Sequence, residues 1–136
     1  MDNSEKLTAR EFVILLFEKL NLYDALSEPG PGREEKEKLL LSDLPADESL
    51  ERKNAARIIH EILKMIGIAD LDNIEPAGAL LDLYDCRVCV NHIAQVYLRG
   101  IMESRKIGGA VIFDSRGTVS VGDAARYAEN IKRVLA

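Results

Sequence analysis

The sequence has 136 residues and a hydrophobic content of 47%, which is enough for one domain with a closed core. Its formal net charge of -5 disfavours binding to nucleic acids or to anionic membranes, since both need concentrated Lys and Arg. No apolar run reaches the roughly 18–20 residues that span a bilayer, so membrane insertion is not expected. The opening residues show no signal peptide. We expect a cell-surface or secreted location if a leader precedes this sequence, and a cytoplasmic location otherwise.

The first predicted helix lies in the segment LTAREFVILLFEKLNLYDAL, residues 7–26. Thr8 and Glu11 have the spacing of a capping box, in which each side chain accepts a hydrogen bond from the other residue's backbone amide. Leu7 and Phe12 are spaced for the hydrophobic staple that accompanies such a cap. Alternating Pro and Gly at 29–32 end this helix, and the charged residues 33–38 predict a solvated helical turn.

The second predicted helix lies in SLERKNAARIIHEILKMIGI, residues 49–68. Its apolar residues recur at helical spacing, and Gly67 fits a C-terminal cap. His60 stands between Ile59 and Glu61, near the polar border, so we expect a partly exposed side chain.

Two further helices are predicted in the second half of the chain. One covers residues 88–102, and the other closes the chain from about residue 120, where Ser120 and Asp123 form a weaker capping box. The glycine-punctuated, β-branched stretch between them predicts at most a minimal β element near 110–113. The sequence therefore predicts an all-α fold of helix–loop–helix units.

Both cysteines and one of the two histidines fall in the spacing Cys86-x-x-Cys89-x-x-His92. A zinc site would need a fourth ligand, for which His60, a water or a second chain are candidates. A redox pair would gain from a helix N-terminus, which lowers a thiol pKa, but the βαβ setting of thioredoxin-like proteins is missing. The third interpretation is that the cysteines are small buried apolar residues at the start of a helix.

The sequence gives no support for catalysis. It has no candidate Ser-His-Asp set, and Gly108-Gly109 lacks the strand-to-helix setting of a phosphate-binding loop. We therefore expect a protein that is not an enzyme.

The segment from Leu81 to Leu135 resembles one full S-layer homology repeat, a unit built as helix, loop and helix. The landmarks of that family are matched in order along this segment: Asp82-Leu83, Gly100-Ile101, Phe113 and the helix-opening motif VSVGDA from Val119 to Ala124. LTAREF (Leu7 to Phe12) resembles the same helix-opening motif, and LERKNAA stands where a further copy is expected. The resemblance implies a single domain over 1–136, with a partial repeat at 7–28, an abbreviated repeat at 39–68 and a complete repeat at 80–136.

This resemblance implies a non-catalytic binding or scaffold module of the cell envelope, whose partner is a cell-wall polysaccharide or a protein. The arginine of the family motif is implicated in holding anionic, pyruvylated polymers. Arg52 occupies that position in the second repeat, and Arg10 lies one place late in the first, so these two are the candidate polymer-binding residues. Two alternatives stay open. One is an intracellular protein–protein interaction domain, and the other is a small zinc-binding domain that uses Cys86, Cys89 and His92.

Overall fold

The computed structural model describes residues 5–21, 38–42 and 44–135. The protein is mostly helical with one small two-stranded sheet, which confirms the predicted helical fold class. The chain forms two compact units. Unit 1 comprises Met1–Leu50 and Thr118–Ala136, and unit 2 comprises Glu51–Gly117.

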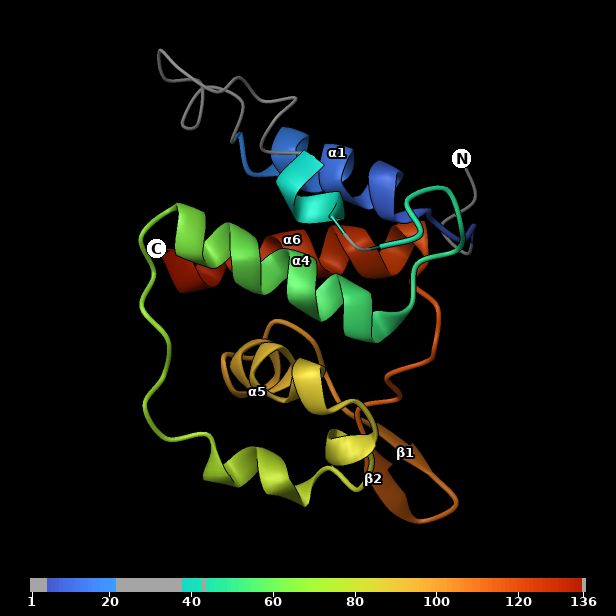
Figure 1. Ribbon diagram of the computed structural model, residues 1–136, viewed down its shortest axis with the longest axis vertical. Coiled ribbons are helices and arrows are strands. Elements are labelled where there is room, and N and C mark those ends of the chain that lie inside the picture. Colours follow the sequence, from blue (N-terminus) through green and yellow to red (C-terminus); the bar gives the residue numbers. More distant parts are fainter. Residues whose placement is uncertain (1–4, 22–37, 43, 136) are drawn as a thin grey trace. The chain divides into compact units, whose positions relative to one another are not determined.

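Unit 1 is built on two helices that pack side by side, α1 (Ala9–Lys19) and α6 (Val121–Leu135) (Figure 1). The predicted capping box starts α1: the Glu11 amide donates to Thr8 Oγ1 over 3.1 Å, and the Thr8 amide donates to Glu11 Oε1 over 3.0 Å. Ser120 and Asp123 form the same reciprocal pair at α6, each over 3.1 Å. Both helices therefore begin where the sequence predicts.

A closed ring of three backbone hydrogen bonds joins distant segments of unit 1. The Leu7 amide donates to the Val119 carbonyl over 3.0 Å, Val119 donates to Leu50 over 3.0 Å, and Leu50 donates to Leu7 over 2.8 Å. All three side chains are buried. Each of the three residues directly precedes a helix N-cap, namely Thr8, Glu51 and Ser120. The ring thus links equivalent positions of the three helix-opening motifs.

Unit 2 contains two α-helices that pack against each other, α4 (Arg52–Met65) and α5 (Val90–Leu98). In Figure 1, α5 is seen nearly end-on while α4 runs across the view, so their axes cross steeply. Three short 3₁₀ helices precede α5, and an antiparallel hairpin follows it. The 3₁₀ helices are η1 (Glu75–Ala79), η2 (Leu83–Asp85) and η3 (Arg87–Cys89), and the hairpin strands are β1 (Arg105–Ile107) and β2 (Ala110–Ile112).

Glycine ends both helices of unit 2 in the same way. Gly67 and Gly100 have φ angles of 89° and 74°, in the left-handed region that other residues adopt at a cost. In each case the next residue, Ile68 or Ile101, donates its amide back to the last turn, to Leu63 or Val96 over 2.9 Å. This is the Schellman arrangement, which satisfies carbonyls that the helix leaves without partners. The predicted cap at Gly67 is confirmed.

Three local predictions need correction or lie outside the described residues. The helix predicted over 88–102 is shorter, because residues 87–89 form a 3₁₀ turn and Gly100 ends α5. The β element near 110–113 has a partner strand at 105–107, which was not predicted. Gly108 and Gly109 supply the two positive φ angles of the tight hairpin turn that joins the two strands. The first helix ends earlier than predicted, at Lys19, and Asn21 has a positive φ angle of 56°. Residues 22–26 of the predicted segment, the Pro-Gly loop and most of the charged run fall outside the described residues.

None of the helices in the described part of the chain is long and apolar enough to cross a membrane. The predicted repeat boundaries, 7–28, 39–68 and 80–136, stay predictions.

The glycine cap of α5 gives a direct test of these local rules. We expect Gly100→Ala to lower the free energy of unfolding by about 1 kcal/mol, because alanine is strained at positive φ. An added Cβ meets nothing within 4 Å at Gly100, so the cost is conformational and not steric. Gly78 also has open space but no positive φ. Gly78→Ala is therefore the matched control, and urea unfolding should place it within about 0.5 kcal/mol of wild type. Equal losses for the two variants would refute the assignment.

Candidate functional site

The two histidines of the chain, predicted as possible zinc ligands, meet inside unit 2. His60 on α4 is 1% exposed and His92 on α5 is half-buried. Their Nδ1 atoms lie 2.8 Å apart, and the rings meet edge to face with their centroids 5.0 Å apart. The expectation of a partly exposed His60 was wrong, because His60 falls four residues after Ala56 and three before Leu63, on the buried stripe of the helix.

A carboxylate and two amides extend this pair into a polar network. His60 Nε2 lies 2.6 Å from Asp70 Oδ1, and Asn91 Nδ2 donates to Asp70 Oδ2 over 3.0 Å. The buried Gln95 donates to Asn91 Oδ1 over 3.2 Å and accepts the Leu71 amide over 2.8 Å. The network therefore joins α4 and α5 to the segment that follows α4, and gives its buried polar atoms partners.

The network limits how many protons the two rings hold. Since an ionised Asp70 only accepts, His60 Nε2 carries a proton. Between the two Nδ1 atoms there is room for one proton, because two N–H groups facing each other at 2.8 Å would repel. One Nδ1 atom can thus donate a hydrogen bond to the other when both rings are neutral or when one ring is cationic. A second charge would break the contact between the two Nδ1 atoms.

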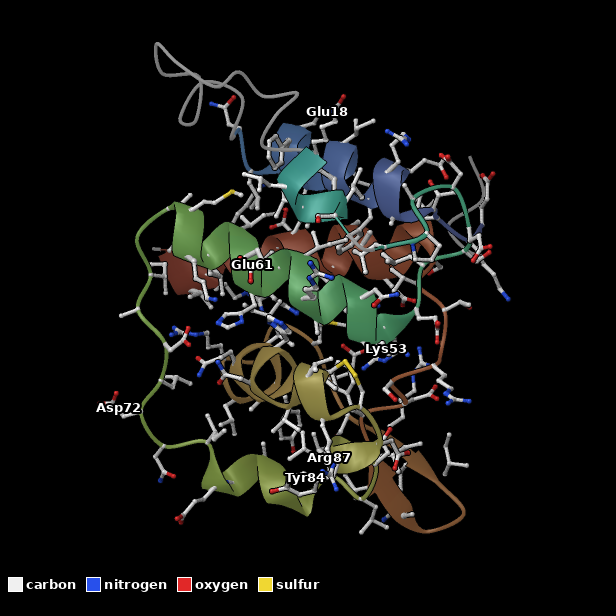
Figure 2. The ribbon with its side chains drawn as sticks, in the orientation of Figure 1. Glu18, Lys53, Glu61, Asp72, Tyr84 and Arg87 are labelled. Atoms are coloured by element: carbon white, nitrogen blue, oxygen red, sulfur yellow. A yellow bond between two sulfur atoms is a disulfide. The ribbon has the colours of Figure 1, made fainter. Side chains whose placement is uncertain are left out.

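Burial and the neighbouring His60 ring lower the pKa of His92. Desolvation is the largest cause, and with the charge of His60 it lowers the pKa of His92 from 6.5 to about 4. Glu61 opposes this shift, whereas Lys64 and Arg57 add to it. Hydrogen bonds from His60 and Asn91 also lower the pKa of Asp70. Figure 2 labels Glu61 on α4.

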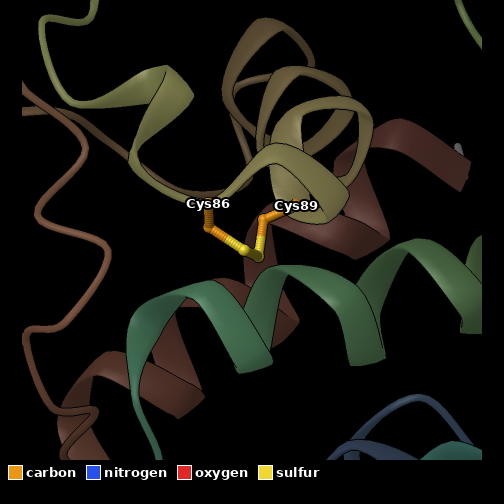
Figure 3. The surroundings of a disulfide bond; sticks show 2 residues. All are labelled: Cys86 and Cys89. Carbon is orange, nitrogen blue, oxygen red and sulfur yellow. A yellow bond between two sulfur atoms is a disulfide. The ribbon is translucent and has the colours of Figure 1, made fainter.

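The predicted ligands Cys86 and Cys89 form a disulfide, with their Cα atoms 5.2 Å apart (Figure 3). A disulfide offers no thiolate to a metal ion. Within the described ranges, His, Cys, Asp and Glu form no group of three or more that could hold a metal. Zinc binding by Cys86, Cys89 and His92 therefore applies to the reduced protein, where it stays a prediction.

Arg52, predicted as a polymer contact, is fully buried. Its Nε donates to the Phe113 carbonyl over 2.9 Å, its Nη2 donates to the Glu103 carbonyl, and the guanidinium stacks on the Phe113 ring at 4.7 Å from the centroid. The Glu103 carboxylate lies 3.9 Å from Nη1. A polymer in solution does not reach Arg52 in this conformation, so its side chain acts as a clamp within unit 2.

Arg10, the other predicted polymer contact, lies on the surface of α1. Its side chain is 55% exposed, and its Nε pairs with Asp47 Oδ1 over 3.1 Å. A surface pair of this kind contributes at most about 1 kcal/mol, so Arg10 can exchange Asp47 for another anion.

Beside α1 and α6, unit 1 has a hollow of about 550 Å³. Apolar residues, Ile14, Leu15 and Val121 among them, share its lining with three carboxylates and one lysine: Glu5, Glu11, Glu18 and Lys19. The excess of negative charge disfavours an anionic ligand in this hollow.

The chain matches no protein-family model, no curated protein and no solved structure.

The lowered pKa of His92 predicts an acid-sensitive unit 2. Between about pH 6.5 and 4 the unfolded chain binds a proton at His92 that the folded chain does not, so stability falls as the pH drops through this range. Allowing for the half-exposed ring, we expect a loss of roughly 1–2 kcal/mol between pH 7 and pH 4.5 by urea unfolding. The pKa of Asp70 is lowered from 3.8, so the stability that depends on its ionised carboxylate is lost only at lower pH.

His92→Gln is the control for this titration, since glutamine keeps hydrogen-bonding capacity but takes up no proton. This variant should lose less stability than wild type over the same interval. Because the chain has two histidines, NMR can follow both rings directly. A His92 ring that titrates near 6.5, with equal acid sensitivity of the two proteins, would contradict the prediction.

Proposed function

We propose that this chain is an S-layer-homology-like, non-catalytic module that binds or scaffolds components of the cell envelope. The ring formed by Leu7, Leu50 and Val119 carries this proposal. Each residue of the ring occupies the same position in LTAREF, LERKNAA and VSVGDA, the segments that resemble the family's helix-opening motif. Equivalent contacts made by equivalent positions are what a set of degenerate repeats needs in order to share one core.

The remaining landmarks of the resemblance also have structural roles that support it. The Asp82 carboxylate accepts the amides of Phe113, Asp114 and Ser115 over 2.7, 2.8 and 3.2 Å. Gly100 ends α5, and the buried Phe113 ring lies under the guanidinium of Arg52. These matches therefore fall on residues that hold the loop before the third motif.

Within this proposal, Arg10 is the residue that contacts an anionic cell-wall polysaccharide. It belongs to the first motif and is exposed, and its counter-ion Asp47 is a single surface carboxylate, 82% exposed. Arg52 is enclosed, and the hollow beside α1 and α6 has an excess of carboxylates. The net charge of -5 also opposes an anionic ligand, so the expected binding is weak and sensitive to salt.

Co-sedimentation with a purified, pyruvylated cell-wall polysaccharide tests the proposal. We expect wild type to bind and Arg10→Ala to bind several-fold less, because the variant removes the exposed cation of the first motif. Asp47→Asn should bind several-fold more tightly than wild type, since it frees Arg10 from its ion pair. The two variants thus act in opposite directions, which a general loss of folding cannot produce.

Arg133→Ala is the matched control, because Arg133 is an exposed arginine of unit 1 outside the three motifs. It should bind like wild type, and circular dichroism should show the same helical signal for every variant. Absence of binding by wild type and by Asp47→Asn alike would refute the polymer contact. That result would favour the alternative function, an intracellular protein–protein interaction domain.

A further inference from the structure

We propose that Cys86 and Cys89 form a reversible dithiol–disulfide site, which exchanges two electrons with a dithiol carried by a partner polypeptide. The disulfide joins residues three apart in sequence, within the 3₁₀ turns that lead into α5. It therefore ties no distant segments together. Stabilisation by a disulfide grows with the length of the loop it closes, so a structural staple is a poor explanation for this one.

The turn is held by interactions that do not need the sulfur–sulfur bond. The Cys89 amide donates to the Cys86 carbonyl over 3.1 Å, and the Val90 amide donates back to the Arg87 carbonyl. Leu83 in the preceding turn is buried. Reduction therefore leaves the backbone of the turn in place, and the two thiols stay within reach of each other for reoxidation.

The two sulfur atoms differ in their surroundings. Cys86 is half-buried, whereas Cys89 is 7% exposed and stands at the N-cap position of α5. Figure 3 shows the bond next to the first turns of α4, the helix that contacts η3. An incoming thiolate therefore reaches Cys86 first. Cys89 is the leaving group, and the positive end of the α5 dipole favours its thiolate.

The electron balance of this exchange is complete. A thiolate of the partner attacks Cys86 Sγ, the Cys86–Cys89 bond breaks, and Cys89 leaves as a thiolate that takes up a proton. The partner's second thiol loses its proton, attacks the partner's sulfur in the mixed disulfide and releases Cys86, which is protonated in turn. The partner's dithiol becomes a disulfide, and Cys86 and Cys89 become two thiols.

Exposed apolar side chains next to the disulfide favour a polypeptide over a small thiol as the reductant. Val88, between the two cysteines, is 85% exposed, and Tyr84 in the preceding turn is 70% exposed. Leu81 is 71% exposed. Figure 2 labels Tyr84 and Arg87 on this part of the chain. An extended peptide that covers Val88 and Tyr84 would bring its own cysteines to Cys86.

The first experiment asks whether the bond is reversible in the folded protein. The full chain is equilibrated in buffers of graded reduced-to-oxidised glutathione ratio, its thiols are trapped by alkylation, and its mass and circular dichroism are recorded. We expect one two-electron transition between disulfide and dithiol with the helical signal unchanged. Reduction that occurs only together with loss of the helical signal would overturn the proposal.

Single-cysteine variants test which sulfur is accessible from solution, and therefore which one an incoming thiolate can reach. Cys89→Ser keeps Cys86 and should form a mixed disulfide with oxidised glutathione at least about tenfold faster than Cys86→Ser, because Cys89 is the more buried of the two. Equal rates would overturn the assigned direction of attack.

A synthetic peptide that carries two cysteines among apolar residues tests the partner. Val88→Ser should slow reduction by this peptide several-fold and leave reduction by glutathione unchanged. Leu71→Ser is the matched control, since Leu71 is also exposed in unit 2 but lies outside the turn. Equal rates with the peptide for wild type and Val88→Ser would overturn the polypeptide partner and assign the exchange to small thiols.

Discussion

The hydrogen-bonded ring of Leu7, Leu50 and Val119 is the constraint on which unit 1 depends. The amide of each residue donates to the carbonyl of another of the three. Every amide and every carbonyl of these residues therefore has a partner within the ring. A buried backbone group without a partner is costly, and the side chains of all three residues are buried. The ring fixes the alignment of three segments that are far apart in sequence. Each segment is followed directly by the first turn of a helix.

Unit 2 uses charged side chains to hold irregular backbone. The carboxylate of Asp82 collects three consecutive amides, and the guanidinium of Arg52 takes carbonyls from Phe113 and Glu103. Such charge-assisted hydrogen bonds are stronger than neutral ones. They suit loops whose backbone lacks the regular hydrogen bonds of a helix or a sheet. Asp82 and Arg52 thus hold the backbone of residues 113–115, directly after the hairpin, from two separate parts of the sequence. The histidine pair and the disulfide are separate features of the same unit.

The sequence predicts local features well, because these depend on neighbouring residues alone. The capping pairs at Thr8 and Ser120 and the glycine after α4 follow from spacing and side-chain type. His60 was misjudged because its exposure was predicted from polarity, although it falls at helical spacing with Ala56 on the buried stripe of α4. Arg52, a candidate polymer contact through its position in the resembled motif, lies on the same buried stripe. Their partners, Phe113 and His92, come from other elements. No local pattern in the sequence indicates these pairings, nor the partner strand at 105–107.

Amide hydrogen exchange of the full chain, followed by NMR, tests the central claim most directly. If the ring joins the three motifs, the amides of Leu7, Leu50 and Val119 exchange with one common free energy, equal to that of global unfolding of unit 1 and higher than that of the amides at the end of α1. Exchange of any one of the three at the rate of a fraying helix end, while the other two stay protected, would contradict the account.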